Sequence, residues 1–181
     1  MVYGIGLAEE HRFSNILEQT TNRKTINFGY PSGSNFIIFR NIMALINYVD
    51  PKDFPEYVVI GWTFPDRFQY YDFVKEQSTG PWLFPIADNE INNSYLHRNN
   101  TAYQGIMETY YIIKAIRLML KDKCKLIEYT TYDPEYSRLI GCKNLLPTSE
   151  ENELVNKARD GIHPGIMWNS RVHDYISGEI I

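Results

Sequence analysis

Tyr57-Val58-Val59-Ile60-Gly61-Trp62 (YVVIGW) is a continuous apolar run with the length of one β-strand. A run that is apolar on both faces is typical of a strand buried in a parallel sheet. Two more segments of strand length lie far from it in the chain, at residues 24–28 (KTINF) and 125–130 (KLIEYT). These three segments predict a parallel sheet.

Apolar residues recur at three- and four-residue spacing in the segments between these strands. The helices predicted in this way, with two shorter ones near the end of the chain, cover residues 9–19, 36–48, 100–121, 151–159 and 165–177. Ser34 and Asn35 are placed to cap the helix at 36–48. We expect loop and helix over 64–77, and an insertion or lid-like loop over 78–93. Strands that alternate with helices predict an α/β fold with right-handed crossovers.

Composition narrows the class of protein. A length of 181 residues suits a single domain, covering 1–181. The net charge of -4 and the absence of a basic block give no footprint for nucleic acid. No apolar run reaches the roughly 18 residues of a membrane span, and the N-terminal sequence does not resemble a signal peptide. Cys124 and Cys142 are too few for a disulfide scaffold and badly spaced for zinc, so we expect two thiols in the cytoplasm, and neither a metal nor an organic cofactor.

In a parallel α/β sheet, ligands bind beyond the carboxyl ends of the strands. Three loops rich in Gly, Pro and polar residues fall at such positions or just before the last helix, namely residues 29–35 (GYPSGSN), 62–67 (WTFPDR) and 160–165 (DGIHPG). We expect these loops to converge on one edge of the sheet.

Asp160 and His163 form the most specific pair of residues in these loops. A carboxylate that accepts a hydrogen bond from one imidazole nitrogen fixes the tautomer, and the other nitrogen is then free to act as a general base. The alternative is that Asp160 caps the last helix and His163 is an ordinary surface residue, which on spacing alone is the more frequent outcome.

The other two loops offer hydrogen-bond donors. Small residues between a strand and a helix expose backbone N–H groups, which suit an oxyanion or a phosphate, although a plain capped loop has the same composition. Thr63 can donate a hydrogen bond to an oxyanion at its strand end. Arg67 can hold an anion or pair with a neighbouring carboxylate.

Taken in order, these blocks resemble the SGNH (GDSL-type) hydrolase superfamily, and in particular its divergent members in phage and environmental sequences. DGIHP resembles the last block of that family, which implies that His163 is the base and Asp160 its orienting residue. NFGYPSGSN resembles the second block, which implies a backbone oxyanion donor at Ser32 or Gly33. GWT resembles the third block, with Thr63 where the family has Asn.

The resemblance implies a three-layer α/β/α domain with a flavodoxin-like parallel sheet and an ester substrate, an acyl group on a sugar or lipid. Asn35, Trp62 and Arg67 are the expected substrate contacts. The block with the nucleophilic serine has no counterpart here, because MVYGIGLAEEHRFSNIL resembles its continuation. We therefore expect the first strand to be missing and the chain as given to be weakly active or inactive.

Two other readings stay open. In the first, the same fold is a non-catalytic module that binds a glycan or a protein through Trp62, Trp82, Arg67 and a Tyr-rich surface. In the second, the chain forms a homo-oligomer, because a missing strand leaves a sheet edge uncovered. Neither reading involves nucleic acid or a membrane.

Overall fold

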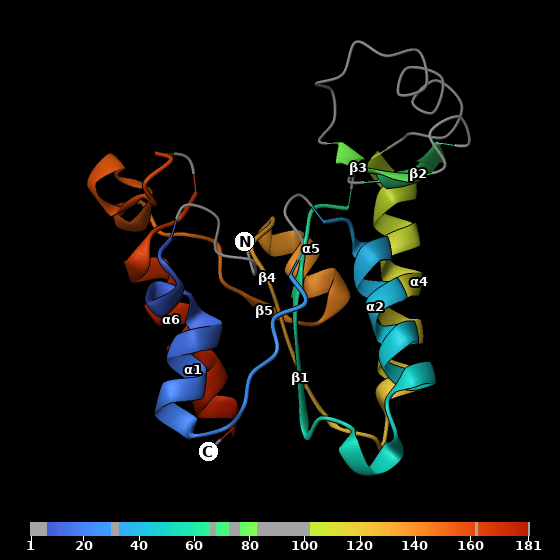
Figure 1. Cartoon of the computed structure of the whole chain (residues 1–181). Helices are drawn as coiled ribbons and strands as arrows, with labels where there is room; N and C mark the ends of the chain where they lie inside the picture. Colours follow the sequence, from blue (N-terminus) through green and yellow to red (C-terminus); the bar gives the residue numbers. More distant parts are fainter. Residues whose placement is uncertain are drawn as a thin grey trace.

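A central parallel sheet organises the molecule (Figure 1). The computed structural model describes residues 7–29, 33–65, 68–72, 77–82, 102–161 and 163–180. The strands β1 (Tyr57–Trp62), β4 (Lys125–Thr130) and β5 (Lys143–Asn144) are parallel and lie in the order β1-β4-β5. The predicted α/β fold class is therefore confirmed, and the two long predicted strands have the predicted bounds.

Helices cover both faces of this sheet. On one face lie α1 (Phe13–Thr21) and α6 (Ile166–Ile180), which contact each other, and on the other lie α2 (Asn35–Tyr48), α4 (Ala102–Leu120) and α5 (Pro134–Ile140) (Figure 1). Each face has its own hydrophobic cluster. The buried residues of the first include Phe13, Leu17, Tyr129, Trp168 and Val172. Those of the second include Ile42, Ile60, Trp62, Ile113 and Ile116.

β1 contributes to both clusters although it lies at the edge of the sheet. Tyr57 and Val59 pack against the α1–α6 layer, whereas Val58, Ile60 and Trp62 pack against the layer of α2 and α4. Successive side chains of a strand point to opposite faces, so an uninterrupted apolar run buries both of them. This alternation is the physical reason for the YVVIGW sequence.

The sequence prediction for the chain between β1 and α4 is wrong where the structure describes it. Residues 64–77 were expected to form loop and helix, but β2 (Phe68–Asp72) pairs antiparallel with β3 (Gln77–Trp82), which also replaces the start of the loop predicted at 78–93. The β2 sequence FQYYD is rich in aromatic residues, which favour strands. Residues 83–93 lie outside the described residues.

The strand predicted at 24–28 is also wrong, since this segment runs from α1 to α2 without pairing to any described strand. The helix predicted at 151–159 is replaced by two short 3₁₀ turns, η3 (Glu150–Asn152) and η4 (Leu154–Asn156). Two similar turns precede α1 and follow α2, η1 (Glu9–His11) and η2 (Pro51–Asp53). α5 and β5 were not predicted.

Among the described parts of the chain, no helix combines the length and apolar character that a bilayer crossing requires.

Candidate active site

The loop between η4 and α6 carries Asp160 and His163, and backbone hydrogen bonds close it tightly. The N–H of Ala158 donates to the carbonyl of His163 (2.9 Å), and the N–H of Gly161 donates to the carbonyl of Ala158 (2.9 Å). Gly161 has a φ of +68, in the left-handed region that glycine adopts without strain. These bonds connect Ala158 both to His163 and to Gly161.

Gly165 closes the other end of this loop. Its N–H donates to the carbonyl of Asn156 (3.0 Å), and a Cβ at this position would lie only 2.2 Å from the same oxygen. Only glycine therefore allows this close approach. Gly161, between Asp160 and His163, and Gly165, after His163, are thus required for different reasons: the first for its left-handed backbone and the second for a close backbone contact.

Asp160 holds His163 at two points. Its Oδ1 accepts the backbone N–H of His163 (3.0 Å), and its Oδ2 accepts the Nδ1–H of the imidazole (2.6 Å). With the proton on Nδ1, the neutral ring has a lone pair on Nε2. Nε2 makes no hydrogen bond with a described residue, and 34% of the His163 side chain is exposed. The structure thus brings the predicted base and its orienting carboxylate together, and no described residue bonds to the second nitrogen.

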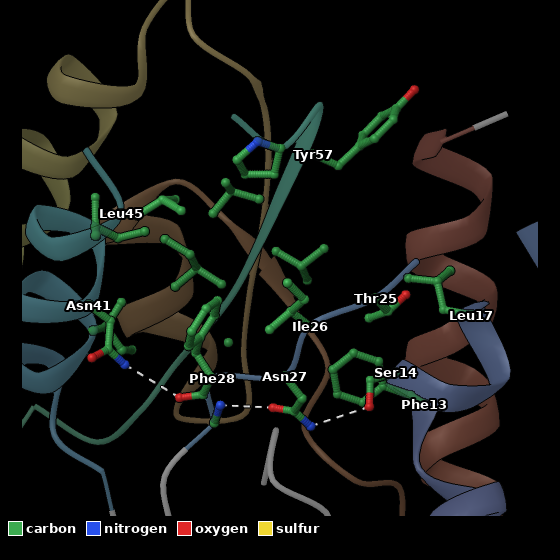
Figure 2. Close-up of a pocket in the computed structure, with 18 of the residues that line it drawn as sticks. Phe13, Ser14, Leu17, Thr25, Ile26, Asn27, Phe28, Asn41, Leu45 and Tyr57 are labelled. Carbon is green, nitrogen blue, oxygen red and sulfur yellow. Dashed lines mark hydrogen bonds between the residues drawn. The ribbon is translucent and has the colours of Figure 1, made fainter. Parts of the chain in front are cut away.

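Gly33 and Thr63 lie apart from the Asp160–His163 loop, in the lining of a cavity of about 480 Å³ along β1. Figure 2 shows Phe13 and Leu17 of α1 on one side of this cavity, and Asn41 and Leu45 of α2 on the other. The hydroxyl of Thr63 makes no hydrogen bond to any described residue, so it keeps the capacity to donate that the sequence predicts. Asp160 and His163 are not part of the lining.

A short chain of hydrogen bonds connects the two places. Phe13, which lines the cavity, donates its N–H to Oδ1 of Asn169 (3.4 Å), and Nδ2 of Asn169 donates to the carbonyl of Gly165 (3.0 Å). The loop of His163 therefore adjoins the first turn of α1. Sequence reasoning missed Asn169, because a polar residue in an amphipathic helix reads as part of the solvent-facing side.

Asn35 has a structural role. Its side chain is 2% exposed, its Oδ1 accepts the N–H of Thr63 (3.0 Å), and its Nδ2 donates to the carbonyl of Thr63 (3.2 Å) and to Oγ1 of Thr109 (3.2 Å). These bonds tie the start of α2 to the end of β1. They use the polar atoms that a substrate contact would require, so the expected substrate-binding role of Asn35 is corrected to one of positioning Thr63.

Trp62 is also placed differently from the sequence expectation. Its side chain is 1% exposed, and its indole N–H donates to Oε1 of Glu128 (2.9 Å), whose Oε2 accepts from Arg117 Nε (2.8 Å). An indole that is buried in this way is part of the core and presents no face to a substrate. Of the other expected residues, Ser32 and Arg67 lie outside the described residues.

Two serine hydroxyls lie in the lining of the cavity, and both make hydrogen bonds away from His163. Ser34 is fully buried, and its Oγ accepts the N–H of Ile37 (3.3 Å) as the N-cap of α2, which confirms the predicted cap. Ser14 is 4% exposed, and its Oγ accepts from Nδ2 of Asn27 (3.2 Å). Neither hydroxyl is hydrogen-bonded to His163.

The two thiols are equally unsuited to nucleophilic attack. Cys124 and Cys142 are free and half-buried. Burial raises the pKa of Cys124, and burial together with the negative charge of Glu128 raises the pKa of Cys142 to about 12. A thiolate, not a thiol, is the nucleophile, so the raised pKa disfavours the reactive form of both residues. In the described part of the chain, His, Cys, Asp and Glu side chains do not gather in threes at a position suited to a metal ion.

Comparisons with protein-family models, with curated proteins and with solved structures find no match for this chain.

Proposed function

We propose that this chain is an SGNH-like hydrolase domain, similar to divergent phage and environmental members, that acts on an ester, an acyl group on a sugar or lipid. One observation carries the proposal: the 2.6 Å hydrogen bond between His163 Nδ1 and Asp160 Oδ2, with Nε2 open. A carboxylate that holds both the backbone and the ring of a histidine orients the imidazole, which is what a general base requires. The two free thiols fit a cytoplasmic location, which is part of the proposal.

In the proposed reaction, a serine Oγ attacks the acyl carbon of the ester while its proton passes to Nε2 of His163. The carbonyl oxygen becomes an oxyanion, which accepts hydrogen bonds from the N–H groups near Ser32 and Gly33 and from the Thr63 hydroxyl. When the tetrahedral intermediate collapses, the alcohol leaves with the proton from His163. Water, activated by the same Nε2, then releases the acid and restores the serine.

In this proposal the nucleophile is the part of the reaction that none of the described residues supplies. The proposal therefore predicts weak or absent hydrolysis of p-nitrophenyl acetate by residues 1–181. An extension ahead of Met1 with an apolar strand and a Gly-Asp-Ser turn should create activity. Because general acid–base catalysis contributes typically 10²–10⁴-fold, His163→Gln in the extended chain should lower kcat/KM by on the order of 10³-fold.

The controls separate the base from a general loss of fold. Replacing the serine of the extension by Ala should abolish the activity, whereas His11→Gln, at a half-buried histidine of η1, should leave it unchanged. Equal activity with and without His163 in the extended chain would refute the proposal. Rapid His163-dependent turnover by the unextended chain would refute its statement about the nucleophile.

The alternative from the sequence, a module that binds a glycan or a protein without catalysis, has less support. Its aromatic platform depended in part on Trp62, whose indole is buried and bonded to Glu128. The side chains of Trp82 and Arg67 lie outside what the structure describes. A binding module of this kind also gives no role to the Asp160–His163 pair.

A further inference from the structure

Four large apolar side chains are exposed beside the loop of His163. Leu154 and Val155 belong to η4, and Ile166 and Met167 start α6. Their exposed fractions are 79%, 83%, 48% and 41%, in that order. Single exposed apolar residues are common on protein surfaces, whereas a contiguous group indicates a surface that binds something. These four residues are called the aliphatic surface below.

The backbone brings the two halves of the aliphatic surface side by side. The N–H of Gly165 donates to the carbonyl of Asn156 (3.0 Å), next to an isolated antiparallel bridge between the same two segments. Val155 precedes this pair on one segment and Ile166 follows it on the other, so the two residues are neighbours across the bridge. The other two residues of the surface come directly after them. Figure 1 shows this part of the chain in orange, next to the start of α6.

The aliphatic surface adjoins the loop of His163 through Leu154. A Cβ placed on Gly161, two residues before His163, would lie 3.8 Å from Cδ1 of Leu154, which is an ordinary van der Waals distance. At the other end, Ile166 comes three residues after His163. The surface thus borders the loop that holds the candidate base. It is separate from the cavity along β1, whose lining includes none of its four residues.

The side chains of the aliphatic surface limit the chemistry of its ligand. All four are uncharged, with no hydroxyl and no aromatic ring. A sugar is bound through aromatic faces and hydrogen bonds, which these side chains do not offer. A stable interface with another protein takes about 20–30 residues on each side, far more than this surface has. A single alkyl chain requires only apolar contact, so it fits the surface better than a sugar or a protein does.

We propose that the aliphatic surface binds an alkyl chain, and that this chain is the acyl group of the ester whose carbonyl carbon reacts beside His163. The second statement rests on the function proposed above, and it selects a fatty-acyl ester over an acetylated sugar. Full burial of one CH₂ group raises affinity about fourfold. An open surface removes only one side of the chain from water, so we expect about a twofold gain in affinity for each added CH₂.

Methyl NMR spectra of residues 1–181 with alkyl maltosides as probes test the alkyl site. We expect decyl and dodecyl maltoside, below the concentrations at which they form micelles, to shift the methyl signals of Leu154, Val155, Ile166 and Met167. Affinity should rise about twofold for each CH₂ group from the decyl to the dodecyl probe. Maltose alone, which has the same head group, should shift none of these signals. Leu118 of α4 is the internal reference, because it is 74% exposed and lies outside the aliphatic surface.

Variants separate the aliphatic surface from general apolar contact. Leu154→Ser combined with Val155→Ser should weaken the binding of dodecyl maltoside on the order of 10-fold, whereas the matched control Leu118→Ser should leave it unchanged. All three side chains are exposed, so the variants should keep the fold, which urea unfolding checks.

Three results would overturn the proposal. The first is an unchanged affinity in the double variant, and the second is a shift at Leu118 as large as those at the aliphatic surface. The third is a dimer of residues 1–181 in sedimentation that the double variant converts to monomers, because a second copy would then be the occupant.

Failure of the alkyl site and failure of the proposed function give different results. His163→Gln should leave the affinity for dodecyl maltoside unchanged, since the imidazole is not part of the aliphatic surface. Alkyl binding without ester hydrolysis by the extended chain would contradict the proposed function alone. Hydrolysis of p-nitrophenyl acetate by that chain without alkyl binding would contradict the alkyl site alone.

The assignment of the alkyl chain as the acyl group has its own readout. In the extended chain, the double variant should lower kcat/KM for p-nitrophenyl decanoate on the order of 10-fold and leave kcat/KM for p-nitrophenyl acetate unchanged. An equal change for the two esters would overturn the assignment.

Discussion

Gly165 allows the loop of His163 to close against the chain that precedes it. Its N–H bonds to the carbonyl of Asn156, and there is no room for a side chain between them. Gly161 serves the same loop through its left-handed backbone. The position of His163 therefore depends on two glycines, which have no side chain that could take part in a reaction.

Gly165→Ala should destabilise the protein by about 2 kcal/mol, since a Cβ 2.2 Å from the Asn156 oxygen forces the backbone apart. Gly178→Ala is the matched control, because a Cβ at this exposed position in α6 meets nothing within 4 Å. In a helix this control should be neutral or stabilising by up to about 1 kcal/mol. Urea unfolding of the two variants provides the comparison, and equal stabilities would contradict the close approach at Gly165.

Spacing alone left the pairing of Asp160 with His163 open, and it was the resemblance of DGIHP to a hydrolase block that favoured it. The structure shows that a three-residue separation in a tight turn allows both backbone and ring contacts. The roles of Trp62 and Asn35 were not predictable in the same way. Both residues are close to candidate site residues in the sequence. Their hydrogen-bond partners, Thr109 for Asn35 and Glu128 for Trp62, are distant in the chain. Only the fold shows that their polar atoms are already used.

At the scale of elements, periodicity identified the pieces with large apolar faces. β1, β4, α2 and α4 match their predicted positions closely because each buries a continuous or regularly spaced apolar set. α5 was missed although its ends carry clear signals: Asp133 caps it, Pro134 starts it and Gly141 ends it with a φ of +65. Seven residues are too few for periodicity to reveal, so capping residues were the only available sign.

The strand predicted at 24–28 failed for a different reason. Its composition favours an extended backbone, but strand formation needs a neighbouring strand with which to exchange hydrogen bonds. The cavity separates it from β1. A sequence pattern predicts the local backbone conformation that a segment prefers, whereas strand pairing depends on a second strand lying beside it.

Ser34, which directly follows Gly33, is the N-cap that fixes the start of α2. Ser34→Ala should cost about 1 kcal/mol, because the N–H of Ile37 loses its side-chain acceptor in a buried position. Ser149→Ala is the matched control, since Ser149 precedes η3 without making a side-chain cap bond, and it should change stability by less than about 0.5 kcal/mol. The unfolding free energies in urea check both values. A loss at Ser149 as large as that at Ser34 would contradict the capping role.

At the scale of the whole molecule, the sheet gathers residues from distant parts of the chain at one edge. The loop of His163 adjoins α1 through Asn169, and Gly33 and Thr63 adjoin the same cavity through α2 and β1. Both hydrophobic clusters extend to β1, yet no described strand covers its outer edge. Two parts of the candidate site thus lie beside the outer edge of β1.

The tautomer of His163 tests the central claim, that Asp160 leaves Nε2 available as a base. A long-range ¹H–¹⁵N NMR spectrum of residues 1–181 at a pH where the ring is neutral would show which nitrogen carries the proton. We predict a proton on Nδ1 and none on Nε2. In Asp160→Asn the new amide oxygen would keep the His163 backbone N–H, its NH₂ would face Nδ1, and the proton should move to Nε2.

His173 provides the internal reference, because its ring contacts Asp174, Thr20 and Ser177, all distinct from Asp160, and its tautomer should not change. A proton on Nε2 of His163 in the unmodified chain, or a tautomer that Asp160→Asn does not alter, would contradict the account.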